Sequence, residues 1–184
     1  MFANTRLLAR LGSLASLIFV FSFAAIWAQD STLEEIKYKE DYDRVQAILK
    51  TSDVQKRSDS IIALYKERPD MRADLRIYVD NNIFLRDLDT LMKAQNIALL
   101  GGVCDKVLKV RPRFGEVYLY QGFVLKSQKK NSEALMAFAK GSVITPNQLK
   151  AKLKQQLDIL YRAEHGGSLI GEDKLVKEAA KELK

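Results

Sequence analysis

The residues best suited to catalysis are few in this sequence and lie far apart. His165 is the single histidine, and it stands in the glycine-rich stretch AEHGGS without a second ligand or nucleophile at a suitable spacing. Asp87 and Asp89 fall in a helical pattern rather than in a calcium-binding loop. The sequence contains no CxxC, HExxH, GxSxG or phosphate-binding glycine motif. These observations predict a protein that is not an enzyme, with no catalytic residues, metal site or cofactor.

The single cysteine, Cys104, excludes an intramolecular disulfide bond. It falls on an apolar helical stripe with Leu100, Val103 and Val107, next to Gly101 and Gly102 in the stretch LLGGVCDKVLKV. This position favours a buried structural thiol over a reactive or dimer-forming one. The glycine pair either weakens the middle of its helix or lets a neighbouring segment approach closely.

A short basic run precedes and follows a proline near the middle of the chain. Its members are Lys106, Lys109, Arg111 and Arg113. Asp105 and Glu116 interrupt the run, and cations at the C-terminal end of a helix are favourable for the helix dipole alone. The net charge of +7 is spread along the chain. We therefore expect no nucleic-acid partner.

The first 28 residues have the layout of a secretory signal peptide. Arg6 and Arg10 precede the acid-free run LGSLASLIFVFSFAAIWA, which ends in small residues. Cleavage after Ala28 or after Ala24 fits the pattern. Residues 1–28 are therefore predicted to be a signal peptide.

Cleavage after residue 28 leaves residues 29–184, which have the size of a single domain. We expect this domain in a bacterial periplasm or outside the cell. The alternative is that residues 11–28 remain as an anchor, because about 18 apolar residues is near the lower limit for crossing a bilayer. The protein would then face outward from the cytoplasmic membrane, and only in that case would it have a membrane partner.

After the N-terminal segment, apolar residues recur at helical spacing, and no convincing strand alternation occurs. The fold class is therefore predicted to be all-α. Ser31 with Glu34, and Ser52 with Gln55, are expected capping boxes at the first two helices. Residues 71–95 form one long helix or two, with Asn81 as the start of a bend or break. The other expected helices cover about residues 31–50, 52–68, 97–111, two segments within 118–146, 148–164 and 171–183.

Each of the three prolines ends a helical segment, because proline cannot continue a helix and disfavours helical geometry in the preceding residue. Pro112 and Pro146 are 34 residues apart, whereas Pro69 and Pro112 are 43 apart. A spacing of about 34 residues is the period of the tetratricopeptide repeat. The longer spacing requires an insertion or an extra turn in the earlier unit.

Residues 115–148 resemble one tetratricopeptide repeat, a family of helix hairpins. The matching residues, which the resemblance implies pack the hairpin, are Tyr118, Gly122, Leu125, Ala134, Phe138, Gly141 and Pro146. Gln121 stands where the family has leucine. In the preceding units, Arg57 takes an alanine position and Asp87 a leucine position. The resemblance implies a short superhelix of antiparallel helix hairpins with C-terminal capping helices.

The family binds peptides or partner helices through first-helix residues on its inner curve. The corresponding positions are Glu116, Leu119, Phe123 and Lys126. The alternative is that neighbouring helices cover Leu119 and Phe123 as ordinary core. The sequence as a whole thus predicts an exported, non-enzymatic scaffold or adaptor for a protein or peptide partner. The alternative function is a membrane-anchored structural subunit of an envelope assembly complex.

Overall fold

The computed structural model describes residues 34–184. The predicted signal peptide, residues 1–28, and the predicted cap at Ser31 lie outside the described residues. The chain divides into two compact units, Met1–Arg44 and Val45–Lys184.

The described part of the first unit belongs to a helix that covers residues 34–49 and continues into the second unit. Within this helix Lys39 Nζ lies 2.9 Å from Asp43 Oδ2, one turn further on. Such exposed pairs stabilise a helix by about 0.2–0.5 kcal/mol. The Tyr38 and Tyr42 rings follow the same spacing, with centroids 6.4 Å apart.

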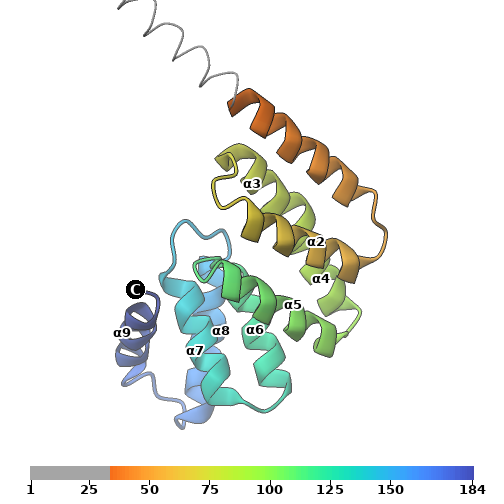
Figure 1. Cartoon of the computed structure of the whole chain (residues 1–184). Helices are drawn as coiled ribbons and strands as arrows, with labels where there is room; N and C mark the ends of the chain where they lie inside the picture. Colours follow the sequence, from red (N-terminus) through yellow and green to blue (C-terminus); the bar gives the residue numbers. More distant parts are fainter. Residues whose placement is uncertain (1–33) are drawn as a thin grey trace, which may run out of the picture. The chain divides into compact units, whose positions relative to one another are not determined.

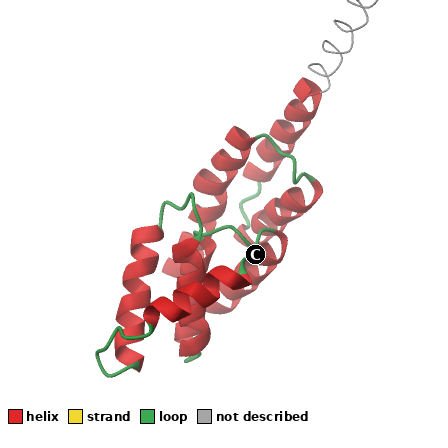
Figure 2. Ribbon diagram, turned by 90° about the vertical axis from the view of Figure 1, so that its left-hand side faces the viewer, coloured by secondary structure: helices red, strands yellow, loops and turns green. Residues whose placement is uncertain are grey.

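The second unit is built from helices, and the described part of the chain contains no strand (Figures 1 and 2). This confirms the predicted all-α class. The helices are α2 (Val54–Glu67), α3 (Ala73–Val79), η1 (Asp80–Phe84), α4 (Leu85–Lys93), α5 (Ile97–Val110), α6 (Val117–Ser127), α7 (Asn131–Val143), α8 (Lys150–Glu164) and α9 (Glu172–Glu182).

Residues 73–93 form one continuous helix that contains a π-helical turn. The turn is η1, and it joins α3 to α4 without a break in the backbone. Asn81 and Asn82 lie inside it, and the Asn82 amide donates a hydrogen bond to the Tyr78 carbonyl at 3.2 Å. The predicted bend thus takes the form of a local widening of the helix, which is how a π turn accommodates an extra residue.

Side-chain caps mark two of the helix starts. At α2, Asp53 accepts a hydrogen bond from the Lys56 N–H at 2.9 Å, so the expected cap at Ser52 was wrong by one residue. At α5, Asn96 accepts from the Leu99 N–H at 3.3 Å. Each cap satisfies an N–H group that has no partner inside the helix.

Helices α6 and α7 form a closely packed antiparallel hairpin. A Cβ atom added to Gly122 would lie 2.2 Å from the Phe138 ring, so only glycine permits this approach. Gly141 allows a similarly close approach of α7 to α8, because a Cβ atom added to Gly141 would lie 2.6 Å from the Leu153 side chain. Ala134 and Phe138 are fully buried between the helices.

The core of this hairpin continues into the last two helices. Helix α7 packs against both α8 and α9, as Figure 1 shows at the blue end of the chain. Helix α8 contributes Leu153, Leu157, Leu160 and Tyr161, and α9 contributes Ala179. Packed helix hairpins of this kind are compatible with a helical-repeat fold.

Among residues 34–184, none of the helices combines the length and the apolar composition that a bilayer crossing requires.

Candidate functional site

The predicted binding residues of α6 are mostly occupied within the fold. Leu119 is 1% exposed and belongs to the core, while Phe123 is partly buried with its ring edge-to-face against Phe138 at 5.7 Å. Glu116 is buried, and Lys126 is exposed. Leu119 and Phe123 therefore agree with the alternative that neighbouring helices cover them. The binding role of the four residues stays a prediction. Little apolar surface of Leu119 and Phe123 is exposed for a partner to contact.

The predicted packing residues of the same unit, with the exception of Pro146, lie in the core that its two helices form. Tyr118 is buried, and its hydroxyl donates to the Pro112 carbonyl at 2.9 Å. Leu125 is partly buried against the core, and Pro146 is exposed in the loop between α7 and α8.

A groove of about 500 Å³ opens between α5 and α7, with α6 as its floor. We call it the α5–α7 groove. Its lining comes from α5 (Ala98, Gly101, Gly102, Asp105), α6 (Tyr118, Gln121, Val124, Leu125), Gln128, Lys130, and α7 (Glu133, Met136, Ala137, Lys140).

Three of the four α5 residues that line this groove, Ala98, Gly101 and Gly102, have little or no side chain. A Cβ added to Gly101 would lie 3.0 Å from Val124 on α6, so this glycine is explained by packing. A Cβ added to Gly102 would meet nothing within 4 Å. Glycine inside a helix costs about 1 kcal/mol relative to alanine. The described fold therefore gives no packing reason for Gly102, which leaves the backbone of α5 open to close approach.

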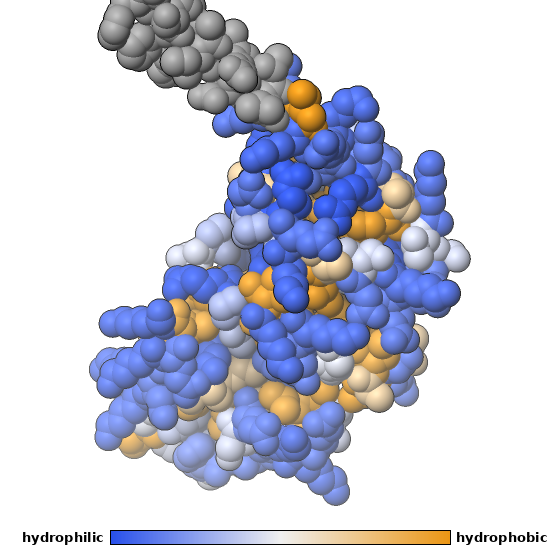
Figure 3. Space-filling model, viewed as in Figure 1, coloured by the Kyte–Doolittle hydropathy of each residue, from blue (hydrophilic) through white to orange (hydrophobic). Residues whose placement is uncertain are grey.

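Each charged group of the α5–α7 groove has a partner within the fold, and Lys130 Nζ lies 3.8 Å from Glu133 Oε2. The Gln121 amide donates to Asp105 at 3.1 Å, and Lys140 Nζ lies 2.6 Å from a carboxylate oxygen of Glu182. Met136 and Leu125 add partly exposed apolar surface. On the face shown in Figure 3, small hydrophobic patches lie between hydrophilic side chains. An occupant would be selected by shape and by mixed contacts rather than by net charge.

A second cavity, of about 400 Å³, lies where α3 and η1 meet the loops that precede α6 and α8. We call it the loop-end pocket. Its lining residues are Arg76, Ile77, Asp80, Asn81, Arg111, Arg113, Phe114, Glu116, Thr145, Pro146, Asn147 and Gln148. Glu116, one of the predicted binding residues, accepts a hydrogen bond here from the Gln148 N–H at 2.9 Å. No residue lines both this pocket and the α5–α7 groove.

One wall of the loop-end pocket is held by Arg111. Its guanidinium donates to both carboxylate oxygens of Asp80, at 2.6 and 3.0 Å, and lies over the rings of Tyr65 and Phe114 at 4.5 and 4.3 Å. The Tyr65 hydroxyl donates to Asp80 at 2.5 Å. Burial and the Asp80 charge raise the pKa of Tyr65 well above its usual value. The phenol therefore remains a donor, and both carboxylate oxygens of Asp80 accept hydrogen bonds.

The residues first considered for chemistry have structural surroundings. The His165 ring stacks on the Tyr161 ring at 3.9 Å, and its Nδ1 lies 2.9 Å from the Tyr161 carbonyl oxygen. Cys104 is buried, and burial raises the pKa of its thiol far above the usual value. Within residues 34–184 no group of three or more His, Cys, Asp or Glu residues is arranged to hold a metal ion.

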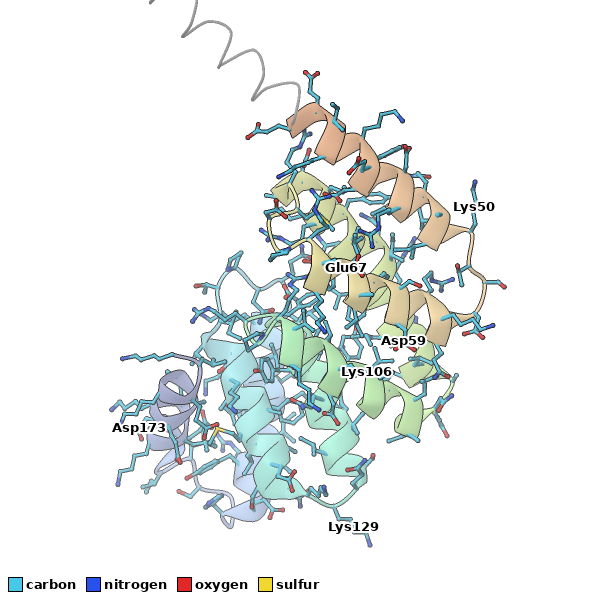
Figure 4. All side chains as sticks on the ribbon, viewed as in Figure 1. Lys50, Asp59, Glu67, Lys106, Lys129 and Asp173 are labelled. Atoms are coloured by element: carbon cyan, nitrogen blue, oxygen red, sulfur yellow. The ribbon has the colours of Figure 1, made fainter. Side chains whose placement is uncertain are left out.

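The basic run is likewise used mainly for contacts inside the fold. Lys106 on α5 lies 2.7 Å from Asp59 on α2, and Figure 4 shows the two side by side. Arg113 donates to the Leu183 carbonyl at 3.3 Å. Together with the Arg111–Asp80 pair, these contacts agree with the structural interpretation of the run.

Neither cavity was predicted from the sequence, and of the four predicted binding residues only Glu116 lines one of them, the loop-end pocket. The Gly101–Gly102 pair was a usable signal, since it suggested close approach of another segment. Asp80 and Arg111 carried no such signal, because the two partners are 31 residues apart and only tertiary packing brings them together.

Searches against protein-family models, curated proteins and solved structures find no match to this chain.

Proposed function

We propose that residues 29–184 are a non-enzymatic scaffold with tetratricopeptide-like repeats, which holds a segment of a partner protein in the α5–α7 groove. The 34-residue proline spacing and the closely packed α6–α7 hairpin support the repeat. In this interpretation α2, α5 and α7 are second helices of successive hairpins, and α8 and α9 cap the array.

The observation that carries the proposal is Gly102 on the wall of the groove. Glycine at this position weakens α5, yet a Cβ atom added to Gly102 would have no neighbouring atom within 4 Å. A residue that is unfavourable for its local secondary structure, and that packing does not explain, is expected at functional sites. A partner segment that lies against the bare α5 backbone would explain the glycine.

The lining also restricts the kind of partner. The groove presents Met136 and Leu125 as partly exposed apolar contacts, with paired charges around them. This combination suits an amphipathic peptide or helix whose small side chains face α5. Apolar anchors would supply the affinity, and the polar rim would set the register.

Site-specific photo-crosslinking in the producing cell tests the proposal. A photoreactive amino acid is placed at Gln128 or Glu133, which are exposed and line the groove, or at the exposed Ala151 on α8 as a control. We expect one partner adduct from the two groove positions and none from Ala151. Adding Gly102→Gln should reduce the adduct at least tenfold, because the new side chain fills the groove.

Gly102→Gln should leave thermal stability equal or higher, since glutamine favours a helix and the position is open. Ala151→Gln is the matched small-to-glutamine control and should not change the adduct. Equal labelling from Ala151, or an undiminished adduct with Gly102→Gln, would contradict the groove as the binding site.

The proposed location, in the periplasm or outside the cell, rests on residues 1–28 of the sequence. Intact mass of the recovered protein tests it. Cleavage after Ala28 would also remove Trp27, the single tryptophan, so the mature protein would show no tryptophan fluorescence. A retained N-terminal segment would instead favour the membrane-anchored structural subunit.

A further inference from the structure

We propose that the loop-end pocket is a second recognition site, which binds a single carboxylate side chain flanked by apolar residues in a partner peptide. It shares no lining residue with the α5–α7 groove. Binding at the loop-end pocket can therefore be tested independently of binding at the α5–α7 groove.

The first step concerns the charges of the pocket. Arg111 is committed to Asp80 through two hydrogen bonds, and Glu116 is committed to the Gln148 N–H. The internal acids are thus already occupied within the fold. Two further cations, Arg76 and Arg113, line the same cavity.

These two arginines have N–H donors that are not used within the fold. Arg76 is partly buried, and within residues 34–184 it makes no ion pair and no side-chain hydrogen bond. Arg113 donates one bond, at 3.3 Å, to the Leu183 carbonyl. A guanidinium carries five N–H donors and matches a carboxylate in a two-bond arrangement. The pocket is therefore lined by guanidinium donors that the fold itself leaves largely unused.

The second step concerns the apolar part of the pocket. Ile77 on α3 is 56% exposed although it lines the cavity, and Phe114 and Pro146 line it as well. A large exposed aliphatic side chain beside uncommitted cations fits a ligand that has an apolar group next to its negative charge.

The acids in the wall distinguish a carboxylate from a phosphate. Asp80 and Glu116 both line the cavity beside its three arginines, so the lining carries an excess of one positive charge, which a singly charged carboxylate balances. The occupant with complementary charge and apolar contacts is therefore an acidic, partly apolar peptide segment.

Titration of the purified protein with short blocked peptides tests this inference. The probe is a leucine–aspartate–leucine tripeptide with both ends blocked, and its comparison peptide replaces aspartate by asparagine. Inorganic phosphate is titrated separately. Binding is followed by the backbone amide NMR signals of Asn81, Phe114 and Gln148, which line the pocket.

We expect the aspartate peptide to shift these signals and to bind at least tenfold more tightly than the asparagine peptide. Arg76→Gln should weaken its binding about tenfold, because a charge-assisted hydrogen bond is lost. Arg113→Gln should have a similar effect. Lys109→Gln, an exposed cation on α5 that does not line the cavity, should leave the affinity unchanged.

Equal affinity for the two peptides, no detectable binding, or tighter binding of phosphate would each overturn the inference. Arg113→Gln could also act by loosening the contact with Leu183. Arg76→Gln has no such contact to lose, so an unchanged affinity in that variant, with an unaltered NMR spectrum of the core, would overturn the inference by itself. Gly102→Gln should not affect this titration.

Discussion

Arg57 on α2 and Asp87 on α4 form a largely buried ion pair between helices that are distant in the sequence. Arg57 Nε lies 2.8 Å from Asp87 Oδ2, and a second guanidinium nitrogen donates to the other carboxylate oxygen. The two side chains are only 18% and 5% exposed. Each side chain therefore supplies the opposite charge that the other needs once it leaves solvent.

Removal of one partner should be far more harmful than removal of both. Asp87→Leu leaves the Arg57 guanidinium without its carboxylate, and we expect a loss of about 3 kcal/mol in the free energy of unfolding. The double variant Arg57→Met with Asp87→Leu should recover most of this loss, because no charge remains buried. Urea denaturation of the two single variants and the double variant gives the coupling energy. Additive losses in the double variant would argue against a coupled pair.

Arg111→Lys should destabilise the protein although the charge is kept. Lysine cannot form the paired bonds to Asp80, and it loses the planar contact with the Tyr65 and Phe114 rings. We expect a loss of about 2 kcal/mol by thermal or urea unfolding. Arg113→Lys is the matched control, because Arg113 makes a single bond to a carbonyl, and its effect should stay below about 0.5 kcal/mol.

Two glycine-to-alanine substitutions should change the stability of the protein in opposite directions. Gly122→Ala places a methyl group 2.2 Å from the fully buried Phe138 ring, so α6 and α7 must separate, at a cost of about 2 kcal/mol. Gly102→Ala meets nothing within 4 Å and should stabilise the protein by about 1 kcal/mol. Melting temperatures of the two variants check both signs. A stabilised Gly122→Ala protein would mean that the α6–α7 contact is looser than described.

Stability should fall at alkaline pH through Tyr120. Burial, with a smaller contribution from the Asp89 charge, raises the pKa of Tyr120 from 10.0 to about 12. The unfolded chain therefore ionises first, and the stabilisation, complete below pH 10, is lost between pH 10 and about 12. The loss should approach about 2–3 kcal/mol.

The test compares Tyr120→Phe with the unaltered protein by urea unfolding at neutral pH and across this alkaline range. The variant cannot ionise at this position, so its stability should decline less steeply. Phenolate absorbance follows the titration in the folded state. Parallel declines for the two proteins would show that Tyr120 does not contribute.

Most of the helices and the helical bend were predictable because their causes are local. The apolar spacing of Leu153, Leu157 and Leu160 gave the buried face of α8, and Asn81 lies within the predicted bend. The cap of α2 was misplaced by one residue because Ser52 and Asp53 both suit that role, and only backbone geometry selects Asp53.

The candidate sites were less predictable. Periodicity shows that Leu119 and Phe123 lie on an apolar face, but it does not say whether that face meets solvent or a neighbouring helix. In the structure both pack into the core that α7 and α8 complete. The places left open are instead the α5–α7 groove and the loop-end pocket, and the Gly101–Gly102 pair is the sequence feature that lies in the groove.

The sequence by itself determined the all-α class, the approximate helix positions and the glycine and alanine sites where helices cross closely. These follow from hydrogen bonds within one turn and from side-chain period, which depend on near neighbours in the chain. Only the tertiary structure decided that Arg57 meets Asp87, that Arg111 meets Asp80, and which surfaces stay open. Such pairs join residues 30 and 31 positions apart, so they depend on how the helices pack.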